Sequence, residues 1–166
     1  MSVSLYGSGQ TIVQVVQTVN NAVFTTSSAG SYASITGWSA TITPLSTSNK
    51  ILVSFNGNVD CSTAGNWAVV GKIQRNGSDI SGALGNARGS ATSGTFSCFS
   101  TSQNYTFPMV GQYLDSPATT SATTYSMQLY AESGSGTLYV GGSSNTANAY
   151  NSSTPFVITL MEVAYA

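Results

Sequence analysis

The sequence predicts an all-β protein, an antiparallel β-sandwich or jelly roll of roughly nine or ten short strands. Short stretches alternate apolar and polar residues with a period of two, which is typical of half-buried strands. Clusters rich in Gly, Ser, Asn and Thr separate these stretches and favour turns. No segment of about ten residues shows a convincing 3.6-residue period, so no long helix is expected.

The predicted strands follow one another along most of the chain. The first covers residues 11–19 and is rich in β-branched side chains. In residues 38–44, Trp38 shares one face with Ala40 and Ile42, which predicts a core position for the indole. The strand predicted at residues 50–60 carries on one face Ile51, Val53, Phe55, Gly57 and Val59. The remaining predicted strands cover residues 67–74, 95–103, 107–115, 123–132, 137–142 and 155–166.

A tight hairpin is predicted in KIQRNGSDI, residues 72–80. Asn76-Gly77 is a strong type I′ signal, because both central positions of that turn need a positive φ. The pairing places Asp79 across from Lys72 or Arg75, where an ion pair adds about a few tenths of a kcal/mol. Charges at an outer hairpin also discourage edge-to-edge pairing, so their clustering is interpreted as structural.

The composition indicates a single domain that works among other protein surfaces. A length of 166 residues is enough to bury a core without metals or disulfides. Charged residues make up 5% of the chain, against roughly 25% in ordinary soluble proteins. The net charge is −1, and a value near zero favours association. We therefore expect an assembly component or an extracellular protein, with residues 1–10 as an arm and residues 11–166 as the domain.

Several classes of protein are disfavoured. Four basic residues are too few to cover a nucleic-acid backbone. No apolar run approaches the roughly 18 residues of a membrane span. The first ten residues, MSVSLYGSGQ, have neither a basic n-region nor an apolar h-region, so no secretory signal is expected. A protein released by host lysis inside a virus particle combines an extracellular composition with that missing signal.

The two cysteines, Cys61 and Cys98, leave two possibilities. A disulfide between them would close a loop of about 38 residues and contribute about 3–4 kcal/mol in the loop-entropy model. Alternatively, both are buried thiols, since nothing else in the sequence marks a disulfide scaffold.

Catalytic chemistry finds little support. Because the chain has no histidine, it has neither a Ser-His-Asp or Cys-His arrangement nor a histidine metal site. A glycosidase needs two carboxylates roughly 5–10 Å apart, and the five carboxylates sit on separate segments: Asp60, Asp79, Asp115, Glu132 and Glu162. Each is more simply a turn residue or a strand-end charge. We expect no enzyme, no catalytic residues and no cofactor.

Two binding alternatives follow from side-chain type. Asn56, Asn58 and Asp60 share a strand face at i, i+2, i+4 and offer oxygen ligands to calcium. The simpler interpretation is a polar strand face, and no metal site is assigned. Aromatic residues near predicted loops are candidates for stacking on sugar rings: Trp67, Tyr139 and Tyr150.

One family resemblance spans nearly the whole chain. YASITGWSATITPLSTSNKILVSFNGNV (residues 32–59), KIQRNGSDI and the closing PFVITLMEVAYA resemble bacteriophage virion domains found in tail fibres and capsid-associated proteins, notably of marine and cyanobacterial phages. The features that carry the likeness are residues 9–19, 35–44 and 48–53, the hairpin at Asn76-Gly77, and the last strand with Glu162. The resemblance implies a jelly roll of the trimeric tumour-necrosis-factor type.

The resemblance implies two roles, because fibre tips and capsid ornaments share the domain. Long fibre proteins have an N-terminal attachment region and a stalk, whereas here about ten residues precede the first strand and no heptad or collagen-like repeat is present. The favoured role is a homotrimeric capsid decoration or cement protein that binds the major capsid protein or another virion protein. Its contacts would lie in the arm, at Met1, Val3, Leu5 and Tyr6.

The alternative role is a tail-fibre tip or receptor-binding module that recognises host-surface glycans through the loop aromatics. A third possibility is a free carbohydrate-binding module, which would be monomeric. Either virion role implies assembly in the host cytoplasm and release by lysis as part of the particle.

Overall fold

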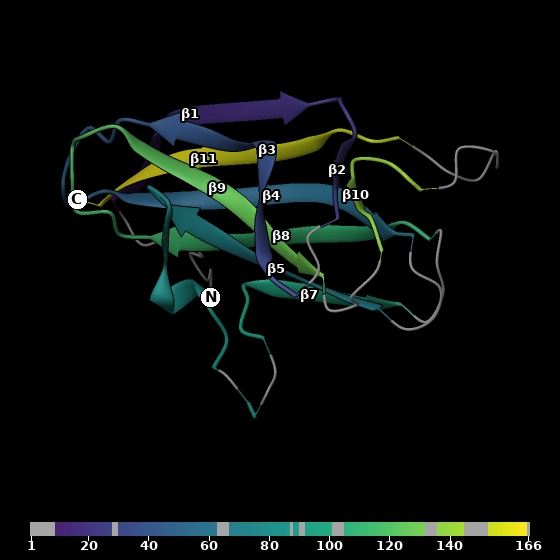
Figure 1. Ribbon diagram of the computed structural model, residues 1–166. Helices are drawn as coiled ribbons and strands as arrows, with labels where there is room; N and C mark the ends of the chain where they lie inside the picture. The colour runs from purple at the N-terminus through teal and green to yellow at the C-terminus, as the bar shows by residue number, and fades with distance from the viewer. Residues whose placement is uncertain are drawn as a thin grey trace, which may run out of the picture.

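The computed structural model consists of two antiparallel β-sheets packed face to face (Figure 1). It describes residues 9–27, 30–62, 67–86, 88–89, 92–100, 105–131, 136–144 and 153–165. Within these residues, no helix is long and apolar enough to cross a membrane. The predicted antiparallel β-sandwich is confirmed.

The larger sheet, sheet A, has six strands. In spatial order it contains β1 (Gln10–Asn20), β11 (Phe156–Tyr165), β4 (Lys50–Cys61), β10 (Leu138–Val140) and β2 (Phe24–Thr26), with β8 (Phe107–Asp115) also paired to β4. Sheet B contains β3 (Tyr32–Ile42), β9 (Thr123–Ala131), β5 (Trp67–Arg75) and β6 (Ser78–Asp79), with β7 (Phe96–Ser100) paired to β5. A single 3₁₀ turn, η1 (Ser81–Ala83), follows β6 within the described part of the chain.

The connectivity of the eight longer strands is that of a jelly roll. The first of these strands in the chain pairs with the last, the second with the last but one, and so on. The pairs are β1 with β11, β3 with β9, β4 with β8, and β5 with β7. All four pairs are antiparallel. This nested pairing produces the two four-stranded layers of a jelly roll, with β2, β6 and β10 as short additions.

The predicted strands are present, and the differences are local. β3 begins at Tyr32, earlier than the alternation starting at Trp38 predicts. Its register with β9 shifts between Ser34 and Ser39, and this irregularity hides the period of two. Gly37 lies there with φ +83°, and a Cβ on it would meet the Asn20 amide at 2.0 Å. β2 was missed because three residues are too few to show an alternation.

An aromatic cluster lies at the centre of the core. Trp38 from sheet B packs against Phe55 and Phe156 from sheet A, with ring centroids 6.2 and 5.5 Å away. The Trp38 Nε1–H donates a hydrogen bond of 2.9 Å to the carbonyl oxygen of Val157. The predicted core position of Trp38 and the buried face of residues 51–59 are both confirmed.

The predicted hairpin forms between β5 and β6. Asn76 and Gly77 have φ values of +49° and +78°, as a type I′ turn requires. Lys72 Nζ lies 2.9 Å from the Asp79 carboxylate. The pKa of Asp79 is lowered mainly by a hydrogen bond from the Gln74 amide, and the hydrogen bond from the Lys72 ammonium is the second cause. Arg75 instead reaches across to the other sheet.

Candidate functional site

The residues predicted for binding are only partly within the described structure. Met1, Val3, Leu5 and Tyr6 of the arm, and Tyr150, lie outside the described residues. Trp67 begins β5, but its side chain also lies outside the described part. Tyr139 is half-buried in the middle of β10, which lies between β2 and β4. Of the proposed stacking residues, the structure therefore describes the side chain of Tyr139 alone, and stacking on sugar rings stays a prediction.

Three of the described carboxylates are buried, which the expectation of turn or strand-end charges did not include. Asp60, Asp115 and Glu162 are 0%, 4% and 0% exposed. Asp79, with 42% side-chain exposure, ends β6, Asp115 ends β8, and Asp60 is the last residue but one of β4, so the strand-end expectation holds for the positions of these three. Glu162 lies inside β11 and contradicts it, and Glu132 lies outside the described residues. Each buried carboxylate is satisfied by donors far away in sequence, which a linear reading of the chain does not reveal.

Asp60 and Glu162 each hold a loop against sheet A. Asp60 Oδ2 accepts hydrogen bonds from the hydroxyls of Ser143 and Ser144 and from the Ser144 backbone N–H, at 2.7–2.9 Å. Glu162 Oε1 accepts from the Leu45 backbone N–H at 2.7 Å and from the Asn49 amide at 2.6 Å. Both carboxylates are 0% exposed, and Asp60 Oδ1 also accepts from the Cys61 backbone N–H at 2.7 Å, so the loop donors and the strand together enclose Asp60.

The burial of Asp60 also contradicts the calcium alternative, which needs the oxygens of Asn56, Asn58 and Asp60 on one open strand face. Asn56 is exposed, whereas Asp60 is covered by the segment at Ser143 and Ser144. The three oxygens therefore do not share one open face. In the ranges that the structure describes, no three side chains of His, Cys, Asp or Glu gather in a group that could hold a metal ion.

Asp115 links the two sheets. It ends β8 in sheet A, and its Oδ2 accepts hydrogen bonds from Arg75 Nη1 at 2.8 Å and from the Tyr125 hydroxyl at 2.6 Å, both in sheet B. Burial raises the pKa of Tyr125 above its ordinary range, and the hydrogen bond to Asp115 is the second largest cause of this increase. The carboxylate thus stabilises the packing of the layers and is not presented to a substrate.

The cysteines do not form the disulfide considered between Cys61 and Cys98. Both are thiols, one ending β4 in sheet A and the other inside β7 in sheet B. Each side chain points into the sandwich, where Cys61 is 1% exposed and Cys98 packs against the core. Desolvation by burial raises the pKa of Cys98 to about 11.

This burial predicts slow alkylation of the native protein. At pH 8, a pKa of about 11 leaves roughly one Cys98 thiol in a thousand as the reactive thiolate, whereas an ordinary thiol is about a quarter ionised. Labelling with iodoacetamide at pH 8 should therefore be at least about tenfold slower than in guanidinium chloride, and should accelerate as the pH approaches 11. Mass spectrometry of the labelled peptides measures both rates. Equal rates in native and denaturing buffer would contradict the buried placement.

The outward side of sheet A forms a surface without charge, which we call the sheet A face. Cross-strand register places its side chains in three rows over β1, β11, β4 and β8. The first row is Val15, Met161, Leu52 and Leu114. The second row is Gln17, Thr159, Ser54 and Gln112. The third row is Val19, Val157, Asn56 and Val110.

The apolar rows of the sheet A face are open to solvent. Val15, Val19 and Val110 are 58%, 50% and 66% exposed. None of the twelve side chains is charged, and Lys50, beside Val163, is the charged residue at the end of the face. Two largely apolar rows, separated by one row of neutral polar side chains, form an exposed uncharged area, and such an area on an outer sheet suits contact with another protein.

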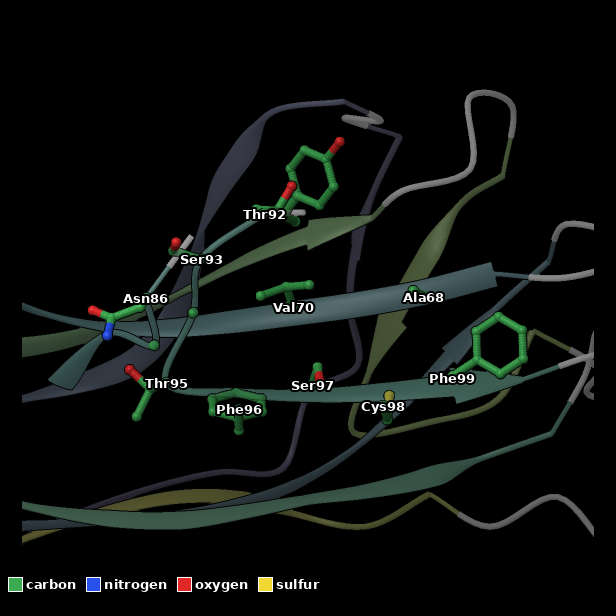
Figure 2. Close-up of a pocket in the computed structure, with 13 residues that line it drawn as sticks. Ala68, Val70, Asn86, Thr92, Ser93, Thr95, Phe96, Ser97, Cys98 and Phe99 are labelled. Carbon is green, nitrogen blue, oxygen red and sulfur yellow. The ribbon is translucent and has the colours of Figure 1, made fainter. Parts of the chain in front are cut away.

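A groove lies on the outward side of sheet B. Its volume is about 460 Å³, and it lies over β5 and β7 beside the loop that leads into β7 (Figure 2). Figure 2 shows Phe99 at one end, Asn86 and Thr95 at the other, and Val70 and Ser97 between them. Sequence reasoning missed this groove, because its residues come from segments that meet only in the folded sheet.

The sequence matches no protein-family model, and no curated protein matches it significantly. The geometry of the two outer faces therefore carries the functional argument.

Proposed function

We propose that this protein is a structural component of a bacteriophage virion, a decoration or cement protein that binds the major capsid protein and stabilises the head. The observation that carries the proposal of an assembly role is the sheet A face, which has two largely apolar rows, one neutral polar row between them and no charged residue among its twelve side chains. Burial of such a face removes no ion from water, so association avoids the desolvation cost of charged groups. Its apolar rows contribute about 25 cal/mol for each Å² buried.

The partner on the sheet A face is proposed to be another copy of the chain. A neutral face neither repels its own copy nor requires a partner of opposite charge. Three copies then bury these faces around a shared axis, as the resemblance to trimeric jelly rolls suggests. In this arrangement the N-terminal arm, with Met1, Val3, Leu5 and Tyr6, is left to contact the capsid.

Binding to the assembled shell stabilises the head by mass action, because the protein binds neighbouring capsid subunits better than separated ones. The proposed role is non-enzymatic: the chain has no histidine, and each described carboxylate is engaged in structural contacts. The proposed location is the virion, reached by assembly in the host cytoplasm and release by lysis.

The copy number in purified virions tests the role. Hundreds of copies per particle, together with a higher melting temperature of shells that carry the protein, are the expected result. A few tens of copies or fewer would favour a tail fibre and overturn capsid decoration.

Charge placed on the sheet A face should dissociate the trimer. We expect the double variant Val15→Lys/Val110→Lys to weaken self-association on the order of a hundredfold or more, because several ammonium groups would have to be buried at the contact. Light scattering at micromolar concentration measures the oligomeric state. Both valines are more than half exposed, so the variant should fold normally.

A matched control is Leu45→Lys, which alters an aliphatic side chain of 67% exposure in the β3–β4 loop, outside the rows. This variant should remain trimeric. Trimers of the double variant would contradict the assigned face. A wild-type monomer would contradict the trimer and favour the free carbohydrate-binding module.

One observation favours the second candidate function, a fibre tip or receptor-binding module that recognises host glycans. The groove on sheet B combines an exposed aromatic ring with neutral polar groups. Binding of the isolated protein to host cells is the result that this function requires.

A further inference from the structure

Among the residues that the structure describes, apolar and neutral polar groups line the groove on sheet B, and no charged side chain does. The apolar part comes from Ala68, Val70, Phe99 and Tyr130, and Phe96 and Cys98 also line the groove although their side chains pack against the core. The polar part comes from Asn86, Thr92, Ser93, Thr95 and Ser97. The nearby Lys72 and Asp79 neutralise each other. A ligand of this groove therefore needs both apolar and hydrogen-bonding surfaces and gains nothing from a charge.

The floor of the groove is set by strand pairing. Ala68 lies opposite Phe99, and Val70 opposite Ser97, between β5 and β7. The intervening Val69 is buried and Cys98 is directed into the sandwich, so the other four side chains face outward. Phe99 remains 58% exposed although it adjoins a concave surface. An aromatic ring in this setting offers a flat apolar face to a ligand.

The rim of the groove is held in place before any ligand arrives. The backbone N–H of Thr95 donates to the Gly71 carbonyl at 2.7 Å, and that of Gly85 donates to the Gly94 carbonyl at 2.9 Å. The Tyr32 hydroxyl donates to the Ser93 carbonyl at 2.5 Å. Because two of these bonds tie Ser93 and Thr95 to β3 and β5, little ordering entropy is lost at this part of the rim on binding.

The Tyr32 ring is itself anchored. Lys72 Nζ lies 4.1 Å from its centroid, and the Tyr130 ring is 5.6 Å away at 50°. Burial and the nearby Asp79 raise the pKa of Tyr32, so its hydroxyl stays protonated as a donor at neutral pH. The side of the groove formed by Tyr130 is therefore fixed by contacts away from the binding surface.

We propose that this groove binds a neutral saccharide. A pyranose has an apolar C–H face and a periphery of hydroxyls, which match the Phe99 ring and the neighbouring hydroxyl and amide groups. The sugar stacks on Phe99, and its hydroxyls bond with Asn86, Thr92 and Ser97. The ligand class rests on the receptor-binding function proposed above. The site lies on the sheet opposite to the sheet A face, so self-association through that face leaves the groove open.

The experiment is saturation-transfer NMR on the full chain with neutral methyl glycosides of glucose, galactose and mannose and with lactose, at millimolar concentration. Wild-type protein should show transfer to at least one of them. Phe99→Ala should weaken binding on the order of tenfold, since it removes the stacking ring. Phe99→Tyr retains the ring and should bind like wild type. Asn86→Ala should also weaken binding.

The control is Leu45→Ala, an exposed residue of the β3–β4 loop outside the rows of the sheet A face, which should leave transfer unchanged. Absence of transfer to every neutral glycoside would overturn the site. If the same protein still bound host cells, the receptor-binding function would stand but would use another surface. Equal binding by wild type and Phe99→Ala would also overturn the assignment. Tighter binding of sialyllactose than of lactose would overturn the neutral ligand class.

Discussion

Trp38→Ala is expected to lower the free energy of unfolding by about 3–5 kcal/mol, the range for large aromatic truncations in a core. The indole is fully buried and packs against Phe55 and Phe156 of the opposite sheet. Its removal leaves a cavity between the layers and also leaves the Val157 carbonyl without the indole donor. Equilibrium unfolding in urea, monitored by circular dichroism, measures the change.

Two variants separate packing from general sensitivity to mutation. Trp38→Phe keeps part of the packed volume but loses the N–H donor, so its cost should be smaller than that of alanine. Tyr105→Ala removes an aromatic ring that is 62% exposed and should change stability by less than about 1 kcal/mol. If Trp38→Ala were no more destabilising than Tyr105→Ala, the packing of Trp38 between the two sheets would be contradicted.

Asp115→Ala is expected to cost about 2–4 kcal/mol. Its loss leaves the buried Tyr125 hydroxyl without an acceptor, at a cost of about 1–3 kcal/mol, and removes the ion pair with Arg75. The total stays below the range for a fully buried pair, because the Arg75 side chain is 36% exposed and regains water. Urea unfolding at pH 7 gives the value.

Asp79→Ala is the matched control, because Asp79 also pairs with a basic residue of β5 but is 42% exposed. That change should cost less than about 1 kcal/mol. In a Tyr125→Phe background, the cost of Asp115→Ala should fall, since no hydroxyl is then stranded. Equal costs for Asp115→Ala and Asp79→Ala would contradict the bridge between the sheets.

The two outer faces of the sandwich differ in shape and therefore in the kind of partner that each can bind. The sheet A face carries extended apolar rows over four strands, which suits a flat protein contact. The sheet B side has a groove with an exposed ring, which suits a small neutral ligand. Because they belong to opposite layers (Figure 1), one protein can use both at once.

The positions of most strands along the chain were predictable from local chemistry. The alternation in residues 50–60 identified β4 and its buried face, because a strand turns successive side chains to opposite sides. Asn76-Gly77 identified the hairpin, because few residue pairs accept two positive φ values. The shared face of Trp38, Ala40 and Ile42 identified a core position. Each inference uses residues only a few positions apart.

The loop-holding carboxylates and both outer surfaces were decided by tertiary structure. Glu162 meets Leu45 across 117 positions of sequence, and Asp115 meets Arg75 across 40, so nothing local marked these carboxylates as buried. The sheet A rows and the groove arise from register between strands distant in the chain. Alternation states that a side chain points inward or outward, but only the pairing of strands determines which side chains become neighbours, because hydrogen-bonded register is a relation between segments.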